Sequence, residues 1–181
     1  MAAIEAIQTI YLEADVASVE FDSLGSYEHL QLRINGATNS TYDSGRYRDA
    51  AILYFNTSVA TTNSDYSQHS MLIRDALENV YSVAAGNAWS TGVIMGTSLG
   101  AARFGGGMVD ILDYRNGSKN TTMMALGGAI GTATGNTECA VTFNGGCWNN
   151  VDAVTKILLI PDLGTAFRRG SEFTLYGLNS S

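Results

Sequence analysis

The sequence predicts an all-β protein, an antiparallel β-sandwich or jelly roll of about nine or ten strands with at most one short helix. Three observations predict it. In Glu28–Asn35, leucine or isoleucine occupies every second position from Leu30 and polar residues lie between them, the two-residue period of a half-buried strand. Similar short runs recur along the chain, and clusters of Gly, Asn, Ser and Asp separate them. Charged residues make up only 15% of the chain, whereas hydrophobic residues make up 45%, which is enough for a sizeable core.

The first half of the chain contains four predicted strands. Ile4–Leu12 keeps its apolar residues in phase, and Val16–Phe21 follows a break at Ala14-Asp15. Glu28–Gly36 and Ala50–Phe55 come next. The polar stretches Thr38–Arg48 and Asn56–Asp65 are rich in turn residues, so they are predicted loops.

The stretch Ser70–Val83 fits two structures. Apolar residues at helical spacing and the Arg74–Glu78 pair four residues apart favour a short helix. The same residues also fit a strand that ends in a turn at Glu78-Asn79. Both interpretations remain open at this level.

The second half contains the remaining predicted strands. They are Thr91–Leu99, Met108–Tyr114, Thr121–Leu126, Glu138–Phe143, Val151–Ile160 and Glu172–Leu178. Asn116-Gly117 is a strong hairpin signal between two of them. Pro161 should end the strand before it, because proline lacks the N–H that a sheet needs. The 181 residues suit one domain, residues 1–181.

Composition excludes several classes of partner. The formal charge is −7 and the ten basic residues form no run, so nucleic-acid binding is not expected. No segment approaches the ~20 apolar residues of a membrane-spanning helix, and the N-terminus lacks the pattern of a secretory signal. We therefore expect a protein that is made in a cytoplasm and later assembles with other subunits.

Cysteine and glycine give local predictions. Cys139 and Cys147 are too few for a zinc set, and a hairpin turn at Asn144-Gly145 would not place them opposite each other. We expect buried thiols without a disulfide. The clusters Gly105–Gly107, Gly127-Gly128 and Gly145-Gly146 predict either tight turns at the ends of the sandwich or close contact with a neighbouring subunit.

The candidate nucleophile motif does not support an enzyme. Gly96–Gly100 matches G-x-S-x-G around Ser98, but a poor helix follows and both histidines, His29 and His69, precede the serine, against the order of the α/β-hydrolases. The two histidines are expected to be satisfied surface residues.

The acidic residues do not form a catalytic or metal site either. Asp110 and Asp113 would point to opposite faces of one strand, which is unsuitable for an acid–base pair. The loop aspartates Asp43, Asp49 and Asp65 lack a calcium-loop spacing. We expect no catalytic, cofactor-binding or metal-binding residue, and no enzymatic activity.

Candidate contact residues lie in the polar loops. Tyr42, Tyr47 and Tyr66 are expected to be exposed there, and exposed aromatic residues are enriched at protein contacts. Arg46 and Arg48 lie beside them in the sequence. These five residues, together with the N-terminal segment, are the predicted partner contacts.

The order of certain strand and turn motifs resembles small structural proteins of tailed bacteriophages. The segments are Ala17–Phe21 with Tyr27–Arg33, Val109–Tyr114 followed by a polar turn and Lys119, and Phe167 with Arg169–Leu178. The resemblance spans nearly the whole chain and implies a β-sandwich or jelly-roll virion component that is often a homotrimer. The resemblance implies no active site.

The resemblance therefore implies a capsid decoration (cement) protein in the virion, bound to the major capsid protein and to copies of itself, with no cofactor. The expected strands begin at about Ile4, without the long N-terminal anchor of many phage fibres, which favours decoration over a fibre. The alternatives are a tail, neck or baseplate component, or a fibre tip that binds a host receptor or glycan. A polysaccharide depolymerase would need a carboxylate pair that the sequence does not offer.

Overall fold

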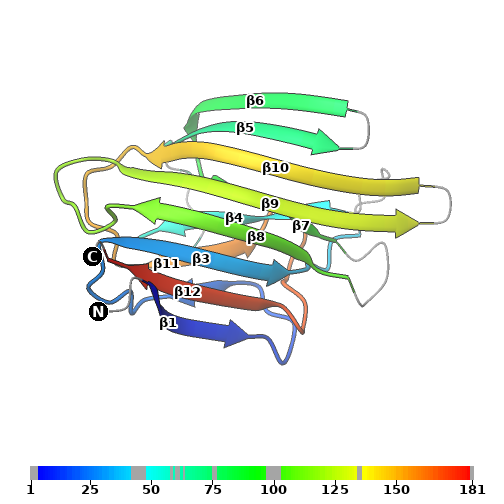
Figure 1. Cartoon of the computed structure of the whole chain (residues 1–181), viewed down its shortest axis with the longest axis horizontal. Helices are drawn as coiled ribbons and strands as arrows, with labels where there is room; N and C mark the ends of the chain where they lie inside the picture. Colours follow the sequence, from blue (N-terminus) through cyan, green and yellow to red (C-terminus); the bar gives the residue numbers. More distant parts are fainter. Residues whose placement is uncertain are drawn as a thin grey trace.

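The computed structural model describes residues 4–41, 48–57, 59, 62, 64–74, 77–96, 103–133 and 136–179. Over these residues the chain forms twelve β-strands in two antiparallel sheets and no helix, so the all-β sandwich prediction is confirmed. The larger sheet runs from β1 to β6 and the smaller sheet lies behind its middle (Figure 1).

The larger sheet has eight strands in the order β1-β12-β3-β8-β9-β10-β5-β6. Their bounds, in that order, are Ile4–Tyr11, Glu172–Leu178, His29–Gly36, Gly105–Leu112, Thr121–Ala133, Asn136–Trp148, Tyr66–Arg74 and Leu77–Gly86. All seven pairings are antiparallel. The strand β12, near the C-terminal end, pairs with β1 on one side and β3 on the other, so strands from the two ends of the chain are neighbours in this sheet.

The smaller sheet has four strands in the order β2-β11-β4-β7. Their bounds are Val19–Phe21, Ile157–Pro161, Arg48–Phe55 and Trp89–Met95. Pro161 is the last residue of β11, in agreement with the predicted end of that strand.

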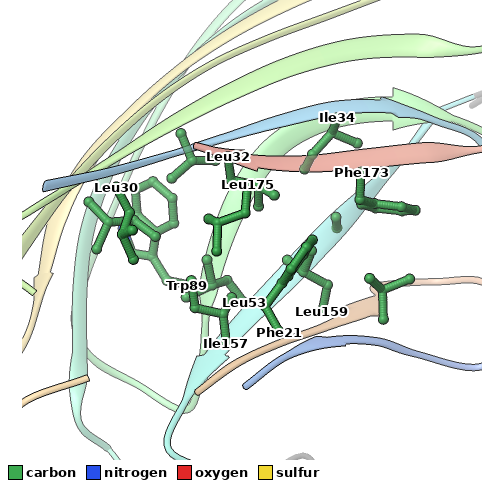
Figure 2. Close-up of a cluster of buried hydrophobic side chains, with 14 of the residues drawn as sticks. Phe21, Leu30, Leu32, Ile34, Leu53, Trp89, Ile157, Leu159, Phe173 and Leu175 are labelled. Atoms are coloured by element: carbon green, nitrogen blue, oxygen red, sulfur yellow. The ribbon is translucent and has the colours of Figure 1, made fainter. Parts of the chain in front are cut away.

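The core lies between the two sheets. Leu30 and Leu32 of β3 and Phe173 of β12 point toward Leu53 and Trp89 of the smaller sheet (Figure 2). All five side chains are fully buried. This explains the alternation of β3, because Leu32 and Ile34 enter the core while Arg33 between them is exposed.

The stretch Ser70–Val83 is part of a β5–β6 hairpin, so the helical interpretation is wrong. The predicted turn at Glu78-Asn79 is also wrong, because both residues pair with β5 inside β6. Apolar residues at helical spacing arise here because both faces of these strands carry apolar side chains: Leu72 is buried, whereas Met71 and Ile73 on the other face are exposed.

The glycine clusters lie inside strands β8, β9 and β10, so the prediction of turns is wrong. Gly92 of β7 and Gly127 of β9 show one reason for glycine: a Cβ on Gly127 would lie 2.9 Å from the backbone N of Val93 and 3.2 Å from the backbone carbon of Gly92. The close approach that glycine permits therefore occurs between the two sheets of one chain.

The two cysteines form no disulfide, in agreement with the prediction. They are not buried, however: Cys139 is exposed and Cys147 is half-buried. Both belong to β10, because Asn144-Gly145 lies inside that strand and does not form the predicted turn.

Candidate interaction surface

The most unusual feature of the surface is a row of apolar side chains across five strands of the larger sheet. Met108 of β8 lies opposite Leu126 of β9, Leu126 opposite Phe143 of β10, Phe143 opposite Met71 of β5, and Met71 opposite Val80 of β6. These side chains are between 36% and 73% exposed, so they lie on the sheet face that points away from the core. We call this row and its apolar neighbours on that face the apolar face.

The apolar face continues beyond the central row. Val141 of β10 lies opposite Ile73 of β5 on one side and Gly128 of β9 on the other, and Gly128 is in turn paired with Gly106 of β8. Met124 and Ile130 extend the face along β9. Gly106 has open space where a Cβ would be, so the two glycines form the floor of a shallow apolar groove beside Val141.

The other half of the same sheet face, over β1, β12 and β3, is polar. Gln31 donates a 2.8 Å hydrogen bond to Asp110, and Thr9 and Thr174 are hydrogen-bonded across β1 and β12 at 3.1 Å. The guanidinium of Arg33 stacks 4.8 Å from the ring centroid of Tyr176. These groups satisfy one another or face solvent, as expected for the wet side of an antiparallel sheet.

Charged residues flank the apolar face on two sides. Arg33 is paired with Met108 at the β3 end of the central row. Asp110 of β8 is paired with Met124 on the same side and accepts the hydrogen bond from Gln31. Glu78 is paired with Ile73 at the β6 margin. The residues of the central row carry no charge.

The structure describes only two of the five predicted contact residues, Arg48 and Tyr66. Tyr42, Arg46 and Tyr47 lie outside the described residues. Arg48 is the first residue of β4 and is half-buried. Tyr66 was expected in an exposed loop, which is wrong: it is the first residue of β5 and only 3% exposed, and its hydroxyl accepts a 2.8 Å hydrogen bond from the backbone N–H of Phe55.

His29 was expected to be a satisfied surface residue, and it accepts a 3.0 Å hydrogen bond at Nδ1 from the backbone N–H of Asp113. Lys119 forms an ion pair with Asp113, and its hydrogen bond and charge lower the pKa of that carboxyl. His29 and Asp113 border a wide, open depression with Tyr27 and Arg115.

Asp49 was expected in a loop, which is wrong: it lies in β4 and is buried. Its carboxylate accepts hydrogen bonds from the hydroxyl of Thr38 at 2.6 Å and from the backbone N–H groups of Leu163 and Gly164 at 2.9 Å each. This buried carboxylate therefore connects three segments of the chain. Over the described part of the chain, no group of three or more His, Cys, Asp or Glu residues could hold a metal ion. The positions of Asp43 and Ser98 lie outside that part.

A second depression has aromatic residues at its base. Phe55, Tyr66 and Trp148 lie below a polar rim that includes Asn56 and Asp152. Glycan recognition by stacking needs an exposed ring face, but all three aromatic residues are buried at no more than 4% exposure. The rings therefore support the core, and only the polar rim is open to a ligand.

Sequence reasoning missed the apolar face. The signal was present in the adjacent methionines Met123 and Met124, of which one is buried and the other is exposed. An apolar residue on both phases of a strand indicates that both sheet faces are covered. Placing these side chains in one row required the pairing of five strands.

No protein-family model matches this chain, and no curated protein is similar to it. None of the described residues forms a helix that could span a membrane. The function must therefore be inferred from the surface itself.

Proposed function

We propose that this protein is a non-enzymatic structural subunit of a bacteriophage particle, and specifically a capsid decoration protein that binds and stabilises the head lattice. The observation that carries a structural role is the apolar face, which lies on a two-sheet body. Exposed apolar patches of several hundred Å² mark contact surfaces in soluble proteins. A subunit that remains attached to its neighbours would keep such a face covered.

The low charge content supports a role in permanent contacts. Charged residues are 15% of the chain and only two lysines occur in it, and lysine is depleted at the cores of protein interfaces. The net charge of −7 would disfavour non-specific binding to DNA during assembly. Repeated weak contacts on a symmetric lattice would add avidity.

The phage particle and its major capsid protein enter the proposal through the resemblance in strand and turn motifs. The alternative of a receptor- or glycan-binding tip is less well supported, because the aromatic rings of the depression at Trp148 are buried. Asp113 at the depression beside His29 is bonded to Lys119, so this carboxylate is already paired, which does not favour a depolymerase.

The test is the location and copy number of the protein in purified particles, measured by electron cryomicroscopy and quantitative mass spectrometry. Hundreds of copies at symmetric positions on the head would support decoration. A few copies at the tail or at one vertex would contradict decoration and favour a tail component. Absence from particles would reject the virion role altogether.

A further inference from the structure

We infer that a second copy of this chain covers the apolar face, and that two molecules pair face to face about a twofold axis parallel to β10. This inference rests on the proposed function only in treating the face as a lasting contact, and it names the partner. Three properties of the face indicate a second copy: its area, the order of its side chains and its charges.

The area is close to what a stable dimer needs. Four strand spacings separate Met108 from Val80, which gives about 19 Å, and six residues separate Met124 from Ile130, which gives about 20 Å. With the width of the side chains added, the face covers roughly 600 Å². This is at the upper end of the largest patch on a typical monomer. Together with its charged margins, it approaches the ~800 Å² per partner of a standard interface.

The side chains on the face are arranged so that the face complements itself. Phe143 is third of the five residues in the central row, on β10. A twofold axis above β10 and parallel to it places Phe143 against its own copy. The same operation exchanges β9 with β5 and β8 with β6, so Leu126 meets the second copy's Met71, and Met108 meets its Val80.

The groove supports the same axis. Ile73 of β5 and Gly128 of β9 lie in one row on opposite sides of Val141. The twofold rotation therefore places the exposed Ile73 of each copy over the glycine floor of the other. A side chain that fills a groove in the other copy is the packing expected when two sheets stack ~10 Å apart.

Charge distinguishes this axis from a second possible twofold axis, which also lies parallel to the sheet but runs along the central row. With the axis parallel to β10, Arg33 of one copy lies at the same margin of the interface as Glu78 of the other, offset by one strand spacing and by two residues along the strand. With the axis along the central row, each Arg33 would meet its own copy, and the like charges would repel. The uncharged centre also lets two acidic chains approach without placing carboxylates against each other.

The first experiment measures the mass of the purified full chain by sedimentation equilibrium across a concentration series. We expect a reversible dimer with twice the 19.2 kDa mass of one chain. Phe143→Thr should raise the dimer dissociation constant at least ~10-fold, since a central aromatic contact is a typical hot spot. Tyr11→Thr is the matched control: it removes an aromatic residue of similar exposure from β1, outside the face, and should change the constant less than ~2-fold.

Leu126→Thr serves as a second variant if Phe143→Thr does not fold, as judged by circular dichroism. A monomer at all concentrations would overturn the inference, and so would the trimer that the phage resemblance implies. A dimer unaffected by both face variants would overturn it too, because it would place the contact elsewhere.

The second experiment tests the axis by charge reversal. Arg33→Glu should weaken the dimer, and the double variant Arg33→Glu with Glu78→Arg should restore it to within ~3-fold of the wild type. No recovery in the double variant would overturn the proposed axis. A dimer in solution combined with absence from phage particles would reject the proposed function and leave this inference standing, so the two can fail separately.

Discussion

The two halves of the larger sheet carry different kinds of side chain on their outer faces. In β3, leucines point into the core and Gln31 and Arg33 face outward, where Asp110 and Tyr176 satisfy them. In β9 and β10, alanine and threonine point inward, whereas Leu126 and Phe143 face outward at about half exposure. The difference shows that the first half is complete as a sandwich within one chain, whereas the second half carries an apolar layer that no part of the described chain covers.

The inner faces of the two halves also differ. Beneath β3 and β12 lies the large core cluster with Phe173 and Trp89. The strands β9, β10 and β5 contribute Trp148 and Tyr66 to that cluster, and a second, smaller cluster beneath them includes Ala129 and Ala140. At the far edge, Tyr81 and Val83 of β6 are about half exposed on the inner side, because the smaller sheet does not extend so far (Figure 1). The smaller sheet thus covers the inner side of the apolar half incompletely.

The largest expected effect is the difference in stability loss between truncating an inward-facing leucine and truncating an outward-facing one. Leu32→Ala should lower the free energy of unfolding by about 2–5 kcal/mol, because it opens a cavity in a fully buried site. Leu126→Ala should cost less than ~1 kcal/mol in the monomer, since that side chain is half exposed. Urea denaturation at a concentration that favours the monomer measures both values. Equal losses would mean that the outer face is covered within one chain.

The next effect concerns two adjacent glycines of β9. Gly127→Ala should destabilise the protein by about 1–3 kcal/mol, because its Cβ would lie 2.9 Å from the backbone of β7 and neither segment can move freely. Gly128→Ala is the matched control: its Cβ would meet nothing closer than 3.7 Å, so monomer stability should not fall. Thermal unfolding of both variants checks this, and a loss for Gly128→Ala alone would contradict the assignment of the two faces.

The smallest expected effect concerns the exposed ion pair between Lys119 and Asp113. Lys119 lowers the pKa of Asp113 through a hydrogen bond and its charge. A carboxyl with a lowered folded-state pKa adds stability above its unfolded pKa of ~4, and this contribution is lost as the pH falls through the folded-state pKa.

Lys119→Gln should therefore cost less than ~0.5 kcal/mol at pH 7, because the pair is exposed, and nothing once the pH is well below the lowered folded-state pKa of Asp113. The measurement is the unfolding free energy as a function of pH. In an Asp113→Asn background the lysine substitution should have no effect at any pH, and a persistent effect there would show that Lys119 acts through another group. Asn suits this control because it tolerates the left-handed backbone of residue 113, where φ is 54°.

Much of the fold could be predicted from local pattern. The alternation in residues 28–36 and the end of a strand near Pro161 follow from the sequence, because side-chain period and proline geometry are local properties. The predicted start of that strand at Val151 is wrong, because β11 begins at Ile157. The β5–β6 hairpin could not be settled in the same way. Its strands are apolar on both phases, so the two-residue period that identifies a strand is hidden and a helical period fits equally well.

The exposure expected for Tyr66 is wrong for a related reason. The polar residues before Tyr66 predict a position at the surface, yet its ring packs against Phe55 and Tyr54 across the sandwich. Whether an aromatic residue beside a loop is exposed depends on what packs above it, and that is a property of the tertiary structure.

The sequence by itself determined the fold class, the small number of charges and the positions of many strands, because each depends on composition or on neighbours along the chain. Only the tertiary structure decided that Met108, Leu126, Phe143, Met71 and Val80 form one row. Those five residues come from three separate parts of the chain, and antiparallel registers between strands bring them into line. Register is set by pairing across the sheet. The local Asn116-Gly117 signal predicts that β8 and β9 are neighbours, but no local pattern in this chain specifies that β5 pairs with β10.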